Sequence, residues 1–323
     1  MLQNKIESKM HTTATIVICF LAVISYQALD TACYRQTYYN STNLSNRVLE
    51  YNRSQAYYNI SSSQLTRALK LDSSTTELRN NKQLYTYIGL REGRMLRCEM
   101  GVFCCARFNS LNQPIRAVAV DRNNLYAGLD NGMMMMCQTH AKDSCFVLNR
   151  GGGSINGIAI QGEYIYAGLD NGILWRCRKY EANSCEDFTR FPNESVESLA
   201  MTEQYIFVGL RSGDMLRCNV DMPACVVLNS ARRRILSLAA SGGYVFAGLD
   251  NGIMWRCRID IRDGCIDFNR ANTPINAMAI VGQHIYAGLE NRVMWKCNEG
   301  WADSCSDMER TDHVIESMVA FYA

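Results

Sequence analysis

A short motif that recurs six times constrains the fold of this chain more than any other feature of the sequence. Each copy has an aromatic and β-branched run, a turn rich in Gly, Asn and Asp, and a second apolar run that ends in Cys. The clearest copies read VFAGLDNGIMWRC, YAGLDNGILWRC and YAGLENRVMWKC, and the six end at Cys98, Cys137, Cys177, Cys218, Cys257 and Cys297. Because Asn-Gly and Ser-Gly supply the positive φ of a tight hairpin turn, each copy predicts a β-hairpin. A spacing of about forty residues with several strands per unit indicates one blade of a β-propeller.

Each repeat contains four predicted strands, which we call a, b, c and d. In one repeat they cover residues 154–160, 164–169, 173–177 and 185–190. The first repeat lacks an apolar a-strand, whereas the chain ends in a seventh one, at residues 314–320, with no b-strand after it. We therefore predict an all-β, six-bladed propeller of four-stranded antiparallel blades. Its C-terminal strand completes blade one, since closure of the ring removes exposed sheet edges.

The first residues of the chain predict export. Lys5 and Lys9 precede an apolar run at residues 14–24, which is the length of a signal-peptide core and short for a membrane span of roughly 20 residues. An uncleaved anchor is the alternative. We expect a signal peptide at 1–28 with an uncertain end, a Tyr/Asn/Ser-rich arm at 29–77 and the propeller at 78–323, with no stable membrane span after signal removal. Glycosylation sequons of the type Asn-x-Ser/Thr support a secreted, extracellular glycoprotein and occur at Asn40, Asn43, Asn52, Asn59 and Asn193.

The chain contains fifteen cysteines, of which Cys19 lies in the predicted signal core. Every repeat has one Cys that ends the hairpin motif and a second a few residues later, at the start of the d-strand. Because adjacent antiparallel strands bring such residues within bridging distance, we predict one disulfide per blade. The predicted pairs are Cys98–Cys105, Cys137–Cys145, Cys177–Cys185, Cys218–Cys225, Cys257–Cys265 and Cys297–Cys305. Cys33 and Cys104 remain, and we infer that they pair. Zinc binding is the alternative, but the Cys-x-x-Cys clusters that it requires are absent from the sequence.

The repeat resembles known propeller repeats. The pattern Y-A-G-x-x-x-G-x-x-x-R is similar to repeats of extracellular and periplasmic propellers of the Asp-box and two-component-regulator kind, and the strand order resembles the WD-repeat plan. The resemblance covers roughly residues 78–323. The paired cysteines depart from those families, as does the lack of a true Asp-box or Trp-Asp dipeptide. The resemblance implies the propeller fold and no particular activity.

Composition and motifs exclude several functions. With 33 basic and 31 acidic residues and no basic run beyond Arg232–Arg234, the chain lacks the basic stripe of a nucleic-acid-binding protein. It contains no nucleophile elbow, zinc-protease motif, phosphate loop or dinucleotide fingerprint. No residue is therefore assigned a catalytic role from the sequence, and no cofactor is required.

The second residues of the six a-strands are expected to form a ring at the mouth of the central channel. Around the barrel they read Glu316, Arg116, Asn156, Glu197, Leu236 and Asn276. Carboxylate and amide oxygens that converge on an axis suit a hard cation such as Ca²⁺. In residue types this ring resembles six-bladed propeller hydrolases of the paraoxonase and strictosidine-synthase type, and that resemblance implies a channel metal. The alternative is a hydrated polar channel in which Arg116 pairs with Glu316.

Charged residues of the b-to-c turns are expected on the same, upper face: Arg91, Asp130, Asp170, Arg211, Asp250 and Glu290. The three c-strand tryptophans, Trp175, Trp255 and Trp295, are predicted to pack between blades rather than to stack on sugars. We expect a binding protein for an extracellular protein, glycan or small-molecule ligand on this face. The alternative is a secreted enzyme that acts on a small molecule at the channel mouth, either a metal-assisted lactonase-like hydrolase or an oxygenase such as a luciferase. The sequence alone does not decide between enzyme and binding protein.

Overall fold

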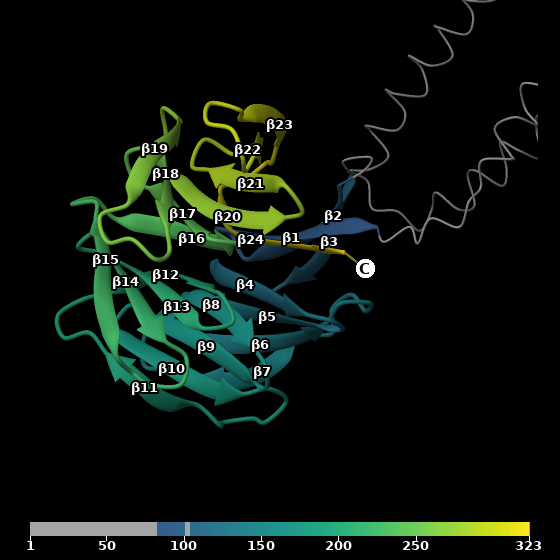
Figure 1. Cartoon of the computed structure of the whole chain (residues 1–323). Coiled ribbons are helices and arrows are strands. Elements are labelled where there is room, and N and C mark those ends of the chain that lie inside the picture. Colours follow the sequence, from purple (N-terminus) through teal and green to yellow (C-terminus); the bar gives the residue numbers. More distant parts are fainter. Residues whose placement is uncertain (1–82, 101–103, 323) are drawn as a thin grey trace, which may run out of the picture. The chain divides into compact units, whose positions relative to one another are not determined.

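The hairpin motifs form the two middle strands of six four-stranded antiparallel sheets. The computed structural model describes residues 83–100 and 104–322. In this part of the chain the sheets stand in a ring, with one a-strand of each sheet innermost (Figure 1). The predicted six-bladed propeller is therefore confirmed.

The blades follow the chain in order, and within each blade the strands a, b, c and d succeed one another from the axis outwards. Blade one consists of β24 (Ile315–Tyr322), β1 (Leu84–Leu90), β2 (Arg94–Glu99) and β3 (Cys104–Ser110). Blade two consists of β4 (Ile115–Asp121), β5 (Asn124–Leu129), β6 (Met133–Gln138) and β7 (Phe146–Arg150). Blade three consists of β8 (Ile155–Gln161), β9 (Tyr164–Leu169), β10 (Ile173–Arg178) and β11 (Glu186–Arg190).

The second half repeats this arrangement. Blade four consists of β12 (Val196–Met201), β13 (Tyr205–Leu210), β14 (Asp214–Asn219) and β15 (Cys225–Ser230). Blade five consists of β16 (Ile235–Ser241), β17 (Tyr244–Leu249), β18 (Ile253–Arg258) and β19 (Cys265–Arg270). Blade six consists of β20 (Ile275–Val281), β21 (His284–Leu289), β22 (Val293–Asn298) and β23 (Ser306–Arg310).

The Asn-Gly pair closes the hairpin between b- and c-strands, as the sequence predicts. Gly172 has a φ of 80°, and a Cβ there would lie 2.3 Å from the carbonyl oxygen of Phe191. A larger residue would therefore displace the neighbouring d-to-a loop. The turn asparagine accepts the backbone N–H two residues later through its carboxamide oxygen, at 3.2 Å in blades two, three, five and six. In blade six the residue after this asparagine is Arg292, with a φ of 71°, in place of glycine.

The ring is closed by the last strand of the chain. β24 pairs antiparallel with β1, from Leu84 opposite Tyr322 to Leu90 opposite Ile315. The rings of Tyr87 and Phe321 stack across this pairing with centroids 5.6 Å apart. Closure by a shared blade is therefore confirmed, and it leaves no open inner edge at blade one.

The apolar core lies between neighbouring sheets. The aromatic residue two positions before the shared glycine of each b-strand is buried, and Phe246, for example, meets Phe268 edge-on at 5.3 Å. The glycine that all six b-strand motifs share allows the next a-strand to approach closely: a Cβ on Gly168 would lie 2.2 Å from the side chain of Val196. Small b-strand residues therefore allow the close approach of neighbouring blades, while the aromatic residues two positions earlier fill the space between the sheets.

Each blade carries one disulfide, as predicted. Cys98 and Cys105 are both disulfide-bonded, and the five bridges of the later blades are Cys137–Cys145, Cys177–Cys185, Cys218–Cys225, Cys257–Cys265 and Cys297–Cys305. Cys33 and the side chain of Cys104 lie outside the described residues, so their pairing stays a prediction.

Several sequence predictions fall on the first 82 residues, which lie outside the described part of the chain. They are the signal peptide, the N-terminal arm and the sequons at Asn40, Asn43, Asn52 and Asn59. No helix among the described residues is long and apolar enough to cross a membrane.

Candidate functional site

The upper face of the propeller carries the b-to-c turns and the d-to-a loops, and the lower face carries the a-to-b turns and the c-to-d loops. At the mouth of the axial channel on the upper face, five of the six expected ring residues line a cavity of about 280 Å³: Arg116, Asn156, Leu236, Asn276 and Glu316. Below them the cavity wall is mainly apolar, and its larger side chains are Val118, Ile158, Leu199, Leu238, Met278 and Met318. The three serines that also line it, Ser198, Ser237 and Ser317, donate their hydroxyls to backbone carbonyls. The channel therefore has a polar mouth and an apolar throat.

Glu197 is the exception, because it does not line the cavity. Its carboxylate accepts a hydrogen bond from Arg211 Nε at 2.7 Å and one from Arg234 Nη2 at 2.7 Å. We call Glu197, Arg211 and Arg234 the Glu197 cluster. The side chain of Glu197 is only 7% exposed, whereas those of Arg211 and Arg234 are 57% and 46% exposed. Burial alone would raise the pKa of Glu197, but the hydrogen bonds from Arg234 and Arg211 hold that pKa below its ordinary value.

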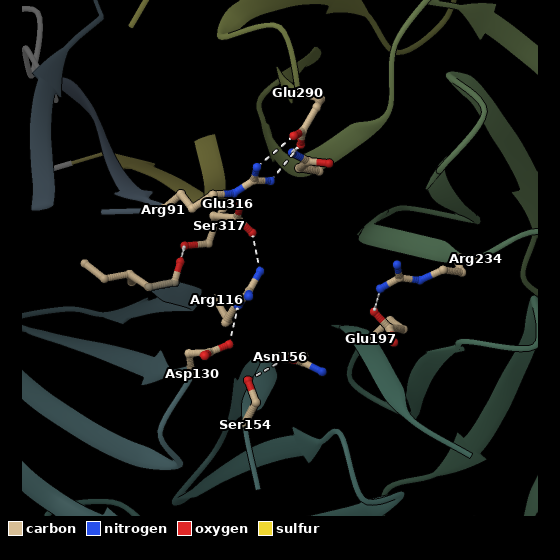
Figure 2. A network of polar contacts seen from close by, with 12 residues as sticks. Arg91, Arg116, Asp130, Ser154, Asn156, Glu197, Arg234, Glu290, Glu316 and Ser317 are labelled. Atoms are coloured by element: carbon tan, nitrogen blue, oxygen red, sulfur yellow. Dashed lines mark hydrogen bonds and ion pairs between the residues drawn. The ribbon is translucent and has the colours of Figure 1, made fainter. Parts of the chain in front are cut away.

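Glu316 is the centre of a second network, on the side of the channel opposite Glu197 (Figure 2). Its two carboxylate oxygens accept hydrogen bonds from Arg91 Nε and, at 2.8 Å, from Arg116 Nη1. Arg91 also makes a bidentate pair with Glu290, with both N···O distances 2.8 Å, and Arg116 Nε donates to Asp130 at 2.9 Å. The predicted pairing of Arg116 with Glu316 is confirmed. We call these five residues the Glu316 cluster.

Electrostatics within the Glu316 cluster favour the charged forms of Arg91 and Glu290. The hydrogen bond to Glu290 raises the pKa of Arg91 above its usual range, and the pairing with Glu316 adds to this. Burial opposes ionisation of Glu290, but hydrogen bonds from Arg91 and Asn276 lower its pKa. The Asn276 carboxamide donates to Glu290 at 2.6 Å. Two arginines therefore share three carboxylates, and every charged side chain of the cluster is paired with another member of it.

The remaining ring residues serve other contacts. The Asn156 carboxamide accepts a hydrogen bond from the Ser154 hydroxyl at 2.8 Å and donates to the backbone carbonyl of Val196 at 3.0 Å. This ties blade three to blade four. Leu236 lines the cavity and offers no polar group.

A common metal site does not form among these side chains. Glu316 and Glu197 lie on β24 and β12, three sheets apart in the ring, and each carboxylate is already held by two guanidinium groups. Within residues 83–100 and 104–322, no group of three or more His, Cys, Asp or Glu side chains is placed to hold a metal ion. These contacts favour the hydrated polar channel over the calcium site, which stays a prediction.

Four of the six charged residues of the b-to-c turns belong to the two clusters, and Asp170 and Asp250 belong to neither. Arg91, Asp130 and Glu290 belong to the Glu316 cluster, and Arg211 belongs to the Glu197 cluster. Asp170 is exposed, has no side-chain partner among the described residues, and lines an open groove of about 640 Å³ with Arg211 and the exposed sequon residue Asn193. One carboxylate oxygen of Asp250 is buried without a partner in that part of the chain.

The c-strand tryptophans pack against the inter-blade core, as predicted. Their indole N–H groups also donate to a d-strand aspartate in the same blade, at 2.8 to 3.1 Å: Trp175 to Asp187, Trp255 to Asp267 and Trp295 to Asp307. The sequence signal for this contact is Cys-x-Asp, which starts the d-strand only in the three blades that have the tryptophan.

Blades one and four share features that the other blades lack. Both have a glutamate at the ring position, an arginine at the first position of the b-to-c turn, and the shorter spacing between the paired cysteines. In both, an arginine from the next blade also reaches the glutamate: Arg116 in blade two and Arg234 in blade five. The sequence prediction included Arg116 but missed Arg234, which lies in the d-to-a loop before the a-strand.

Comparisons with known proteins show the fold and no family. No family model matches the chain, and no curated protein matches it. Among solved structures, one titled as a nidogen/laminin complex is similar, with a TM-score of 0.64 and 10% sequence identity, over 73% of this chain and 98% of that one. A computationally designed protein named Ika8 matches with a TM-score of 0.49 and 11% identity, over 75% of each chain.

Proposed function

We propose that this chain is a secreted extracellular binding protein that takes its ligand on the upper face of the propeller. The observation that carries this proposal is the set of charged side chains which the turns and a-strands of different blades bring together at the channel mouth. A rigid ring of sheets holds them, and binding residues are often placed on loops that a rigid scaffold positions.

The charge on this face is both ordered and accessible. Glu197 and Glu316 are buried and fix the guanidinium groups of their partners, while Arg91 and Arg211 are about half exposed. A ligand would therefore meet pre-oriented donors, whose side-chain entropy has been lost before binding.

The covalent frame supports an extracellular location. One disulfide in every blade is typical of proteins that fold in an oxidising compartment. One similar solved structure is a complex of nidogen with laminin. At 10% identity this likeness concerns the fold alone, but it makes laminin a reasonable probe in a binding panel.

A glycan introduced on one face at a time tests which face binds. Gly152→Asn creates the sequon Asn-Gly-Ser in the d-to-a loop after blade two, at a residue whose added Cβ would have no neighbour within 4 Å. Ala182→Asn creates Asn-Asn-Ser in an exposed c-to-d loop on the lower face, and it serves as the matched neutral control. The probes are immobilised laminin, immobilised heparin and neutral glycans.

We expect the Gly152→Asn glycan to weaken capture of the bound probe at least about tenfold, which corresponds to about 1.4 kcal/mol. Enzymatic removal of the glycan should restore binding, and Ala182→Asn should leave it unchanged. Loss of binding with Ala182→Asn alone would place the ligand on the lower face and contradict the proposal.

A further inference from the structure

One d-to-a loop of the upper face differs from the other five. Residues 231–234 read Ala-Arg-Arg-Arg, whereas the other five loops, all of them within the described residues, contain no lysine or arginine. Arg211 of the adjacent b-to-c turn joins this loop through Glu197, which also holds Arg234. We call Arg211, Arg232, Arg233 and Arg234 the arginine cluster.

The guanidinium groups of this cluster have unused donors. Arg232 and Arg233 are exposed, and their side chains make no hydrogen bond or ion pair within residues 83–100 and 104–322. Arg211 donates to Glu197 through Nε, and Arg234 donates to Glu197 through Nη2. The other guanidinium nitrogens of both arginines stay available. Two of the four cations, Arg211 and Arg234, therefore share one carboxylate. The other two, Arg232 and Arg233, have no carboxylate partner among the described residues.

The equivalent place across the ring is neutralised. There Arg91 and Arg116 share three carboxylates, and the d-to-a loop at residues 111–114 carries no charge. Three further carboxylates lie near the arginine cluster. Asp170 and Glu194 line a groove with Arg211, and one oxygen of Asp250 in the b-to-c turn of blade five is buried. None of the three forms an ion pair with the cluster within residues 83–100 and 104–322. Single arginines also end the d-strands of blades two, three, five and six, but only the loop at residues 231–234 brings several arginines together on the upper face.

The available donors suit a tetrahedral oxyanion. A guanidinium presents two parallel N–H groups that match the oxygens of a sulfate, carboxylate or phosphate in a bidentate manner. Leu236 is the ring residue of blade five, and it adds no charge next to this position. An acidic peptide would in addition need apolar anchor pockets, which carry most of the binding energy of protein partners. The cluster offers charge and hydrogen bonds, which is what a sulfated polysaccharide requires.

We infer that the arginine cluster of blades four and five binds the sulfate groups of an extracellular sulfated glycan. This inference rests on the proposed function, because it names the class of ligand for the same face. Arg211 and Arg234 are held in place by Glu197 and bind one sulfate with their outward N–H groups. Arg232 and Arg233 bind a neighbouring group along the glycan chain.

The test is calorimetric titration of a heparin octasaccharide into the secreted full-length protein. The double variant Arg232→Ser with Arg233→Ser removes two exposed, unpaired arginines. Its matched control is Arg150→Ser with Arg310→Ser, which removes two other exposed arginines without side-chain partners in the described residues, at the upper ends of β7 and β23. Both double variants change the net charge equally.

We expect the Arg232/Arg233 variant to bind heparin at least about tenfold more weakly, while the control stays within about twofold. Affinity should fall as salt rises, since exposed charges are screened. Desulfated heparin and hyaluronan should not bind. Arg233→Lys keeps the charge but loses the paired N–H donors of the guanidinium, and it should give an intermediate loss of heparin affinity.

Three outcomes would overturn the inference: no binding of heparin by the unaltered protein, equal losses in both double variants, or tighter binding of a sulfotyrosine peptide than of heparin. If heparin fails to bind while the Gly152→Asn glycan still blocks capture by laminin, the inference falls and the proposed function stands. Heparin binding that neither the Gly152→Asn glycan nor the Arg232/Arg233 variant affects would contradict both the inference and the proposed function.

Discussion

The Glu316 and Glu197 clusters occupy equivalent places on opposite sides of the channel, yet they connect different parts of the chain. Arg91 and Glu316 are 225 positions apart, and Arg116 and Glu316 are 200 positions apart. Glu197 contacts Arg211 and Arg234, which are 14 and 37 positions away. The Glu316 cluster therefore joins the first strands to the last one, whereas the Glu197 cluster lies within a continuous stretch.

This difference separates two roles for the same combination of residues. At blade one the arginines are shared among Glu316, Glu290 and Asp130, so they strengthen the closure of the ring. At blade four the chain is continuous and needs no such closure, and the arginines keep free donors. A duplicated arrangement can thus stabilise the scaffold on one side and bind a ligand on the other.

Deletion of residues 314–323 should have the largest effect of the changes that test this comparison. It removes β24, the inner strand of blade one, together with Glu316 as the centre of its cluster. The exposed edge of β1 and the lost core contacts should abolish secretion or cause aggregation. Secretion of the truncated protein with an unchanged melting temperature would show that neither β24 nor the Glu316 cluster closes the ring.

Neutralising the two glutamates should affect stability unequally. Glu197→Gln leaves Arg211 and Arg234 without a carboxylate partner among the described residues and should cost about 1–3 kcal/mol in the free energy of unfolding. Glu316→Gln should cost less, since Arg91 and Arg116 keep Glu290 and Asp130. Chemical denaturation of both variants measures the difference, and an equal or reversed order would contradict the assignment of partners.

The stabilisation from Glu197 should also depend on pH. The pKa of this carboxyl is lower in the folded protein than its ordinary value of 4.5. Its contribution is therefore present above pH 4.5 and is lost as the pH falls through the lowered pKa. Melting temperatures between pH 6 and pH 3 should fall more steeply for the unaltered protein than for Glu197→Gln, and parallel curves would refute this.

The sequence predicted the fold well because its signals are local and repeated six times. The turn glycines predict hairpins, the Cys pairs predict one disulfide per blade, and the a-strand at residues 314–320 predicts closure of the ring. The structure confirms all three. The Trp–Asp contact was also available from the sequence, because Cys-x-Asp accompanies Trp175, Trp255 and Trp295 and is absent elsewhere.

The candidate site was less predictable because side-chain direction depends on neighbouring blades. Position in the a-strand placed Glu197 in the ring, but Arg211 and Arg234 draw it away from the cavity. Arg234 could not be assigned from the repeat pattern, since the equivalent arginine, Arg116, lies two positions further along the repeat. Contacts between repeats therefore cannot be read from the repeat pattern alone.

A calcium titration should give the smallest effect. If arginines occupy both ring carboxylates, Ca²⁺ added to chelator-stripped protein should release no heat and leave the melting temperature unchanged. Glu197→Gln and Glu316→Gln serve as controls for any heat that appears. A clear binding isotherm that either substitution abolishes would establish the metal-bound channel and revive the enzyme alternative, because a Lewis acid at the mouth can polarise a substrate.

Hydrogen exchange in the presence of saturating heparin octasaccharide compares the two clusters most directly. The account predicts slower amide exchange in residues 209–213 and 231–236, at the Glu197 cluster and the arginine loop. It predicts no change in residues 88–93 and 314–318, at the Glu316 cluster, or in the lower-face loop at 259–264. Protection at the Glu316 cluster or on the lower face, without protection at residues 231–236, would contradict it.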